Sequence, residues 1–216
     1  MSLGIDLGAA VLFGAVGVAL VEAPRRLHVR AGGESGSTRF DAWLSFGFTV
    51  LGFAGFKCGL GVDFVQSMVV GLSFELLAAV VYGDLRYQSV SPVCWAPLAL
   101  LAVARAAIVS GWIDGLLGAL VCGVVMTAGV LGARQFKLNK GVGTGTIGLA
   151  AALGGMVGVG WGLRVLAAAV VCSALAFAVL AITRGDKPED QAEPLAAPLG
   201  AALALAGFAA VIVIWK

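Results

Sequence analysis

Residues 141–154 read GVGTGTIGLAAALG, and at this stretch a basic loop gives way to a long apolar segment. Arg134, Lys137 and Lys140 precede it, and no charged residue follows before Arg164. A helix needs about 20 predominantly apolar residues to cross the hydrocarbon core of a bilayer. The stretch therefore predicts the start of a membrane-spanning helix.

The same pattern of apolar segments and short polar loops recurs along the chain. Of its 216 residues, 60% are hydrophobic and only 12% are charged, and the mean hydropathy is +1.02. Because the surface of a soluble domain with this composition would be largely apolar, an aqueous globular protein is excluded. We expect an all-α fold, a polytopic membrane helical bundle of about eight transmembrane helices. The expected spans are residues 4–22, 42–60, 64–83, 93–111, 115–133, 145–162, 164–182 and 195–215.

The lysine and arginine residues sort to one side of these spans. Positively charged loops are retained in the cytoplasm, so we expect that side to face the cytoplasm and both termini to lie outside it. The expected cytoplasmic group is Arg25, Arg26, Arg30, Arg39, Arg86, Arg134, Lys137, Lys140, Arg184 and Lys187, whereas Lys57, Arg164 and Lys216 fall on the other side. The net charge of only +2 and the absence of a basic stripe outside the loops argue against a nucleic-acid partner.

Glycine is abundant inside the expected spans. The chain has 32 glycines, and residues 154–160 read GGMVGVG. Small residues allow helices in a membrane to approach one another closely. We therefore expect tight helix packing at this segment, with a mobile, gate-like helix as the alternative.

Two ionisable residues fall at membrane depth. Glu75 lies in the middle of the third expected span, and Arg105 lies well inside the fourth. Because the two spans run antiparallel, both residues are expected at a similar height, and an isolated charge there is costly. The sequence therefore predicts an intramembrane ion pair between Glu75 and Arg105. This pair would serve as a clamp between helices, or Glu75 would contact substrate or act as a replacement acid.

Three stretches combine polar residues with helix ends. Residues 83–92 read GDLRYQSVSP and close the third span, residues 142–149 read VGTGTIGL and open the sixth, and residues 197–206 read APLGAALALA and open the last. In order and topology they resemble the type IV prepilin peptidases, which are membrane aspartyl proteases of bacterial inner membranes. In that family, an aspartate is followed after five residues by Ile-Pro, and a Gly-x-Gly-Asp motif is followed by an apolar residue and a lysine.

The resemblance assigns roles to individual positions. Asp84 matches the first catalytic aspartate, and Gly143 and Gly145 match the glycines of the second motif. Thr146 stands where the family has its second catalytic aspartate, and Gly148 stands where it usually has lysine. By the same resemblance, residues 64–216 are expected to form a six-helix core, after two N-terminal helices and a short basic loop in residues 1–63.

The replacement at Thr146 removes half of the chemistry that the family uses. Aspartyl proteolysis requires two carboxyl groups around one water, one protonated to polarise the peptide carbonyl and one ionised to accept a proton from the water. A threonine hydroxyl does not exchange a proton near neutral pH. The resemblance thus predicts the architecture of an endopeptidase that cleaves leader peptides of pilin-like substrates, with doubtful activity.

A second acid would have to come from the loop before the last span. The candidates are Asp186, Glu189, Asp190 and Glu193, although their charge-rich setting is more typical of a solvated turn. No metal or cofactor is expected, because the loop at residues 23–41 lacks the Cys-x-x-Cys pairs of the family, and Cys58, Cys94, Cys122 and Cys172 are scattered. His28 in this loop is expected to be solvated.

The expected partners are pilin-like leader peptides and the lipid bilayer of the bacterial inner membrane. Two other functions remain open at the level of sequence. One is a catalytically inactive protein that binds pilin leaders as an assembly factor, and the other is a small transporter that uses Glu75 and Arg105. The sequence leaves the oligomeric state open.

Overall fold

A computed structural model describes residues 3–30, 38–59, 63–87, 90–108, 111–135, 143–184 and 199–214 of this chain. Within these ranges the protein forms helices and no strands, so the expected all-α fold is confirmed. The helices are α1 (Leu3–Arg30), α2 (Thr38–Gly59), α3 (Phe64–Tyr87), α4 (Pro92–Ile108), α5 (Trp112–Gln135), α6 (Thr144–Arg184) and α7 (Leu199–Ile214).

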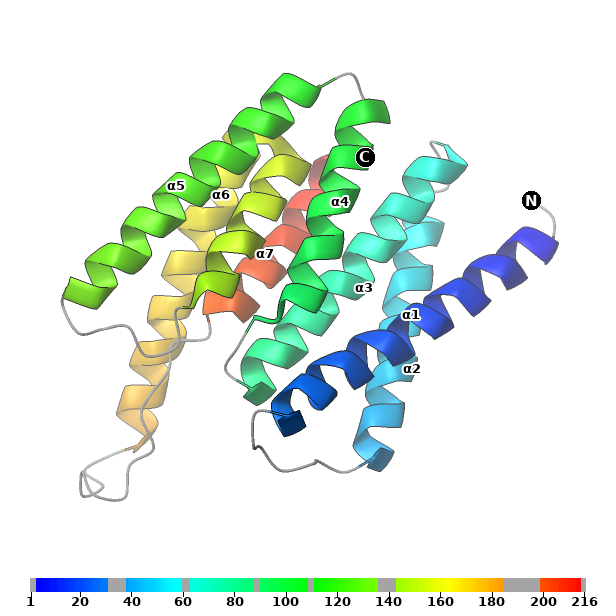
Figure 1. The fold of residues 1–216 in the computed structure, drawn as a ribbon, viewed down its shortest axis with the longest axis horizontal. Coiled ribbons are helices and arrows are strands. Elements are labelled where there is room, and N and C mark those ends of the chain that lie inside the picture. The colour runs from blue at the N-terminus through cyan, green and yellow to red at the C-terminus, as the bar shows by residue number, and fades with distance from the viewer. Residues whose placement is uncertain are drawn as a thin grey trace.

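The helices run back and forth between two ends of the bundle (Figure 1). At one end, α3 finishes at Tyr87, and α4, α6 and α7 begin. We call this the basic end, because Arg25, Arg26 and Arg86 lie in the helix segments that reach it. The first turns of α1 and the last turns of α7 lie at the opposite end.

Helix α6 is not one continuous rod. Gly158 has φ 80° and ψ 174°, a backbone conformation that costs glycine little and other residues much. A methyl group on Gly162 would lie 3.2 Å from the Cα of Gly154, whereas eight residues of unbroken helix span about 12 Å. The chain therefore reverses at Gly158, and α6 consists of a first arm before this residue and a second arm after it.

The position of this reversal differs from the expectation. The sequence predicts separate spans at residues 145–162 and 164–182, with the break at residue 163. The structure places the break at Gly158 and keeps Gly160 and Gly162 helical. Glycines are frequent throughout the segment, so their presence alone does not mark which one takes the non-helical conformation.

Four of the helices in the described part of the chain contain segments long and apolar enough to cross a membrane. These segments are Asp6–Ala23, Phe64–Tyr87, Trp112–Ala133 and Thr144–Val179, the last of which includes the reversal. Helices α4 and α7 are apolar but shorter. Large apolar side chains such as Leu100, Val124 and Leu175 are exposed on the outside of the bundle. The structure thus indicates a membrane-embedded protein.

The main hydrophobic core lies around α3, the first arm of α6 and α7. Leu77, Leu153 and Leu203 are fully buried at its centre. The same cluster includes Leu20 of α1 and Phe48 of α2, while Ala9, Phe13 and Phe56 form a second, smaller cluster between these two helices.

Helix α5 packs closely against the first arm of α6 through glycines on both sides. A methyl group on Gly115 would lie 2.9 Å from the carbonyl oxygen of Gly155, and one on Gly154 would lie 2.8 Å from the Cβ of Cys122. Larger residues at these positions would push the helices apart. The expected tight packing at residues 154–160 is confirmed for Gly154 and Gly155.

Candidate functional site at the basic end

Asp84 lies near the end of α3 and its side chain points into the protein. The residue is only 4% exposed, and its Oδ2 accepts a hydrogen bond of 2.8 Å from the backbone amide of Ala201. The amide of Gly200 also faces the carboxylate. Both amides belong to the first turn of α7, where helical N–H groups lack partners within the helix. Asp84 therefore caps the start of α7 from a different helix.

Gly200 makes this contact possible. A methyl group on Gly200 would lie 2.9 Å from the Cγ of Asp84 and 2.5 Å from the Cγ2 of Val90. Carbon atoms do not approach so closely, so any larger residue would force α7 away from α3.

Val90 links this contact to the glycine motif of α6. A methyl group on Gly145 would lie 3.0 Å from the carbonyl carbon of Val90 and 3.1 Å from its Cβ. The buried Val90 thus lies between the first arm of α6 and the start of α7. Val90 belongs to the first of the three stretches that carry the family resemblance, and it lies against Gly145 of the second and Gly200 of the third.

Thr146 lies in the first turn of α6 and is 2% exposed. Its backbone amide donates a hydrogen bond of 3.1 Å to the carbonyl of Gly143. No described Cα atom of α6 lies within 8 Å of a Cα atom of α3, so the backbones at Thr146 and Asp84 are not in direct contact. They are linked indirectly, because Gly200 lies against both Asp84 and Val90, and Val90 lies against Gly145, the neighbour of Thr146.

No second carboxylate interacts with Asp84 among the side chains that the structure describes. The groups found around its oxygens are the amides of α7. The alternative acids Asp186, Glu189, Asp190 and Glu193 lie outside the described residues, as do Lys137, Lys140 and the side chain of His28. Their involvement therefore stays a prediction.

Gly148 packs against an aromatic ring. A methyl group on Gly148 would lie 2.6 Å from the Cε2 atom of Trp95, which belongs to α4. The lysine that the family usually carries at this place would therefore displace the indole ring. Local packing therefore explains why a glycine fits at position 148. The indole of Trp95 packs between α4 and the first arm of α6.

The predicted ion pair between Glu75 and Arg105 does not form. Both carboxyl oxygens of Glu75 are buried and have no hydrogen-bond partner among the described residues. They face Gly17 of α1 and Gly52 of α2, whereas the guanidinium of Arg105 donates a hydrogen bond to the carbonyl of Met156 in α6. The two residues project from their helices in different directions, which a similar height in the membrane does not determine.

Sequence reasoning also missed Asp114, in the first turn of α5. Its Oδ1 accepts a hydrogen bond of 3.3 Å from the amide of Val159, and its charge interacts with Arg105. Asp114 thus holds the start of the second arm of α6, while Arg105 holds the carbonyl of Met156 at the end of the first arm. The two charges stabilise the backbone groups that the break at Gly158 leaves without helical partners. The glycine-rich segment was the available signal, because a broken helix needs polar partners.

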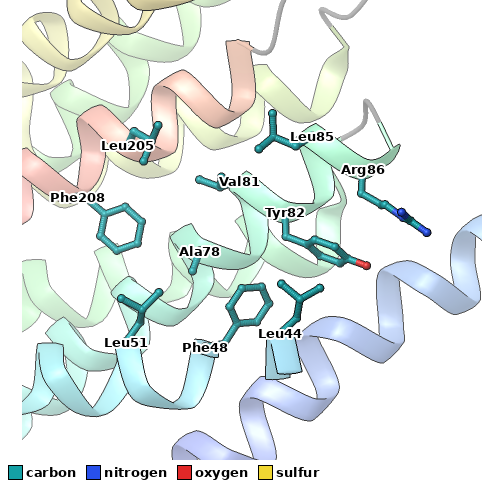
Figure 2. Close-up of a pocket in the computed structure, with 10 residues that line it drawn as sticks. All are labelled: Leu44, Phe48, Leu51, Ala78, Val81, Tyr82, Leu85, Arg86, Leu205 and Phe208. Carbon is teal, nitrogen blue, oxygen red and sulfur yellow. The ribbon is translucent and has the colours of Figure 1, made fainter. Parts of the chain in front are cut away.

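Two apolar grooves flank α7 close to Asp84. The first has a volume of about 530 Å³ and lies between α2, α3 and α7, as Figure 2 shows. Its lining residues are Leu44, Phe48, Leu51, Ala78, Val81, Tyr82, Leu85, Arg86, Leu205 and Phe208. The second, of about 400 Å³, lies between α3, α7 and the second arm of α6. In Figure 2 the side chain of Arg86 points away from the apolar lining, so the first groove carries no inward charge.

The fold and the site identify only a general class of protein. It is an all-helical, membrane-embedded protein with a buried aspartate that joins α3 to α7. Comparisons with protein-family models, with curated proteins and with solved structures gave no match. Within the described residues, no three His, Cys, Asp or Glu side chains gather as metal ligands would.

Proposed function

We propose that this chain is a membrane protein of prepilin-peptidase-like architecture that binds the leader segments of type IV pilin-like proteins and has weak or no endopeptidase activity. The observation that carries this proposal is the convergence at Val90. Val90 belongs to the first stretch that resembles the family and lies against Gly145 of the second and Gly200 of the third, and Gly200 also lies against Asp84.

The proposal includes a topology. The chain crosses the bacterial inner membrane eight times, the two arms of α6 counting as separate spans, and residues 64–216 form the six-helix core. The basic end faces the cytoplasm, where the leader of a pilin-like substrate is present, and both termini face the periplasm. The distribution of lysine and arginine supports this orientation, since basic residues favour the cytoplasmic side.

Cleavage is weak or absent for two reasons. The hydroxyl of Thr146 cannot share the acid and base roles of a carboxyl pair. In addition, the carboxylate of Asp84 is engaged by the backbone of α7 and is almost fully buried. Loss of one member of a catalytic pair removes most of the rate, on the order of several powers of ten.

The apolar grooves support a binding role. Their volumes lie in the range of about 300–1,000 Å³ that is typical of ligand-binding pockets. They share Val81, Leu85 and Leu205, so both border the helix face that leads to Asp84. An apolar helical segment placed in either groove would lie along Val81, Leu85 and Leu205, and Leu85 follows Asp84 in the chain.

The test is leader cleavage by the full chain in lipid vesicles with a pilin-like substrate. The wild type should bind the substrate and leave it intact. Thr146→Asp restores a second carboxyl and should raise cleavage above the wild type, and Asp84→Asn in that background should abolish the gain. Efficient cleavage by the wild type that depends on Asp84 would contradict the proposed loss of activity. If a folded Thr146→Asp variant binds the substrate but does not cleave it, the proposal of a peptidase-like site would be contradicted.

An assembly factor that only binds leaders is the second candidate. The role of Asp84 as a cap for α7 favours it, because holding two helices together is a structural role that needs no catalysis. Substrate binding that survives Asp84→Asn, with no turnover in any variant, would select this candidate. The transporter alternative loses the ion pair on which it rested, since Glu75 and Arg105 have different surroundings.

A further inference from the structure

Glu75 is the most unusual polar residue in the described part of the chain. It lies in the middle of α3 and is 0% exposed. Neither of its carboxyl oxygens has a hydrogen-bond partner among the described residues. An ionised carboxylate at this depth is costly when no counter-charge offsets its lost hydration. The proposed leader-binding function does not use this residue.

Two glycines make room for the carboxyl group between α1 and α2. A methyl group on Gly17 would lie 3.0 Å from Oε1 of Glu75, and one on Gly52 would lie 3.2 Å from Oε2. The side chain of Glu75 therefore fills a space that both neighbouring helices leave open. This is a shaped site for a carboxyl group, which spans three helices.

The other polar atoms near Gly17 are oxygens of α2. The same methyl position on Gly17 lies 2.9 Å from the carbonyl oxygen of Ser45 and 3.1 Å from Oγ1 of Thr49. Thr49 donates its hydroxyl proton to that carbonyl, with an oxygen–oxygen distance of 2.9 Å. The hydroxyl therefore has lone pairs to accept a hydrogen bond but no proton left to donate to a carboxylate.

We propose that Glu75 is a proton-binding site, in which the carboxyl group is protonated at neutral pH. The protonated acid is neutral, so it can be buried between α1, α2 and α3 without a counter-charge. The ionised form would place a net charge in low-dielectric surroundings with no donor among the described groups, which is penalised. The proton thus allows the three helices to pack around this side chain.

No charged group among the described residues provides a counter-ion for Glu75. Its carboxyl oxygens face Gly17 of α1 and Gly52 of α2, and Ser45 and Thr49 of α2 lie near Gly17; none of these four residues titrates. Helix α7 has no titratable residue. Charged side chains on α1, α2, α3 and α4 engage other groups: Lys57 binds Asp6, Arg25 and Arg26 bind Glu22, Arg105 binds the carbonyl of Met156, and Asp84 binds the amide of Ala201.

A metal cation is the competing occupant. Sodium and other hard cations prefer about six oxygen ligands. The described oxygens are the two of Glu75 and, near Gly17, one hydroxyl and one carbonyl, and that carbonyl already accepts a hydrogen bond from Thr49. A proton needs only one acceptor, so the oxygens present satisfy a proton and leave a cation short of ligands.

Infrared spectroscopy of the full chain in lipid vesicles tests the proposal. The difference spectrum between the wild type and Glu75→Gln at neutral pH should contain the carbonyl band of a protonated carboxylic acid, which is lost in the variant. Exchanging potassium for sodium should leave this band unchanged. The matched control is Glu22→Gln, which removes a partly exposed glutamate paired with Arg25 and Arg26 and should not remove the acid band.

Two results would overturn the proposal. One is a difference spectrum in which Glu75→Gln removes a carboxylate band and no acid band. The other is loss of the acid band on addition of sodium, which would make a metal cation the occupant. If Glu75→Gln does not fold, the wild type labelled with ¹³C at the glutamate carboxyl gives the same information. An isotope-shifted acid band would support the proposal, and its absence would contradict it.

Discussion

Helix α3 carries two buried carboxyl groups whose surroundings differ. Asp84 lies close to the last residue of α3, at the basic end of the bundle. Its carboxylate is held by the first backbone amides of α7, so it joins α3 to α7. In the middle of the same helix, Glu75 faces two glycines and has no hydrogen-bond partner among the described residues. Both residues are acidic, buried and on one helix. The difference shows that the role of a buried acid depends on which donors face it, and burial alone does not determine that role.

Removing the side chain of Asp84 should have the largest effect. Asp84→Ala leaves buried amides of α7 without an acceptor, which should lower the free energy of unfolding by about 2–3 kcal/mol. Asp84→Asn retains one acceptor oxygen and should lose about 1 kcal/mol. Unfolding in mixed detergent micelles, followed by circular dichroism, measures both values. Equal and small losses in the two variants would mean that the cap contributes little to stability.

Adding a methyl group on the other side of this contact should have an intermediate effect. Gly200→Ala places a methyl 2.9 Å from the Cγ of Asp84, and such overpacking costs about 1–3 kcal/mol. Gly14→Ala is the matched control, because a methyl on Gly14 of α1 meets nothing within 4 Å. The same unfolding measurement should show a loss for Gly200→Ala only. A loss of similar size in both variants would show that the effect is not specific to the contact with Asp84.

Replacing Glu75 by its neutral isostere should have the smallest effect at neutral pH. If Glu75 carries a proton, Glu75→Gln exchanges one neutral group for another and should change the free energy of unfolding by less than about 1 kcal/mol. At alkaline pH the wild type must bury an ionised carboxylate or lose packing between α1, α2 and α3, while the variant does not. The variant should therefore become the more stable of the two as pH rises. Parallel pH profiles would contradict a proton at Glu75.

The sequence predicts the general architecture of the molecule well and its contacts poorly. Long apolar segments reveal helices because each must bury its backbone polar groups within itself in a bilayer. The reversal in α6 was expected at residue 163 and occurs at Gly158, since several glycines there permit a break and only the packing against α5 and Asp114 selects one.

The candidate site shows the same limit. The resemblance to a family linked Asp84 with the glycine motif and the start of the last helix, and these segments do meet at Val90. The pairing of Glu75 with Arg105 failed because sequence position gives the height of a residue in the membrane but not the direction of its side chain. The role of Asp114 was not predicted because its partner is a backbone amide of the broken helix. Every residue except proline has such an amide, so the sequence does not show which one needs a partner.

The central claim is that Asp84 is held by the backbone of α7 and has no second carboxyl group beside it. Solid-state nuclear magnetic resonance on the full chain in lipid bilayers, labelled with ¹³C at aspartate and glutamate carboxyls and with ¹⁵N at alanine, tests this directly. The claim predicts a close contact between the carboxyl carbon of Asp84 and the amide nitrogen of Ala201, and no carboxyl–carboxyl contact to Asp84. A second carboxyl carbon close enough to share a water with Asp84, together with loss of the Ala201 contact, would contradict it.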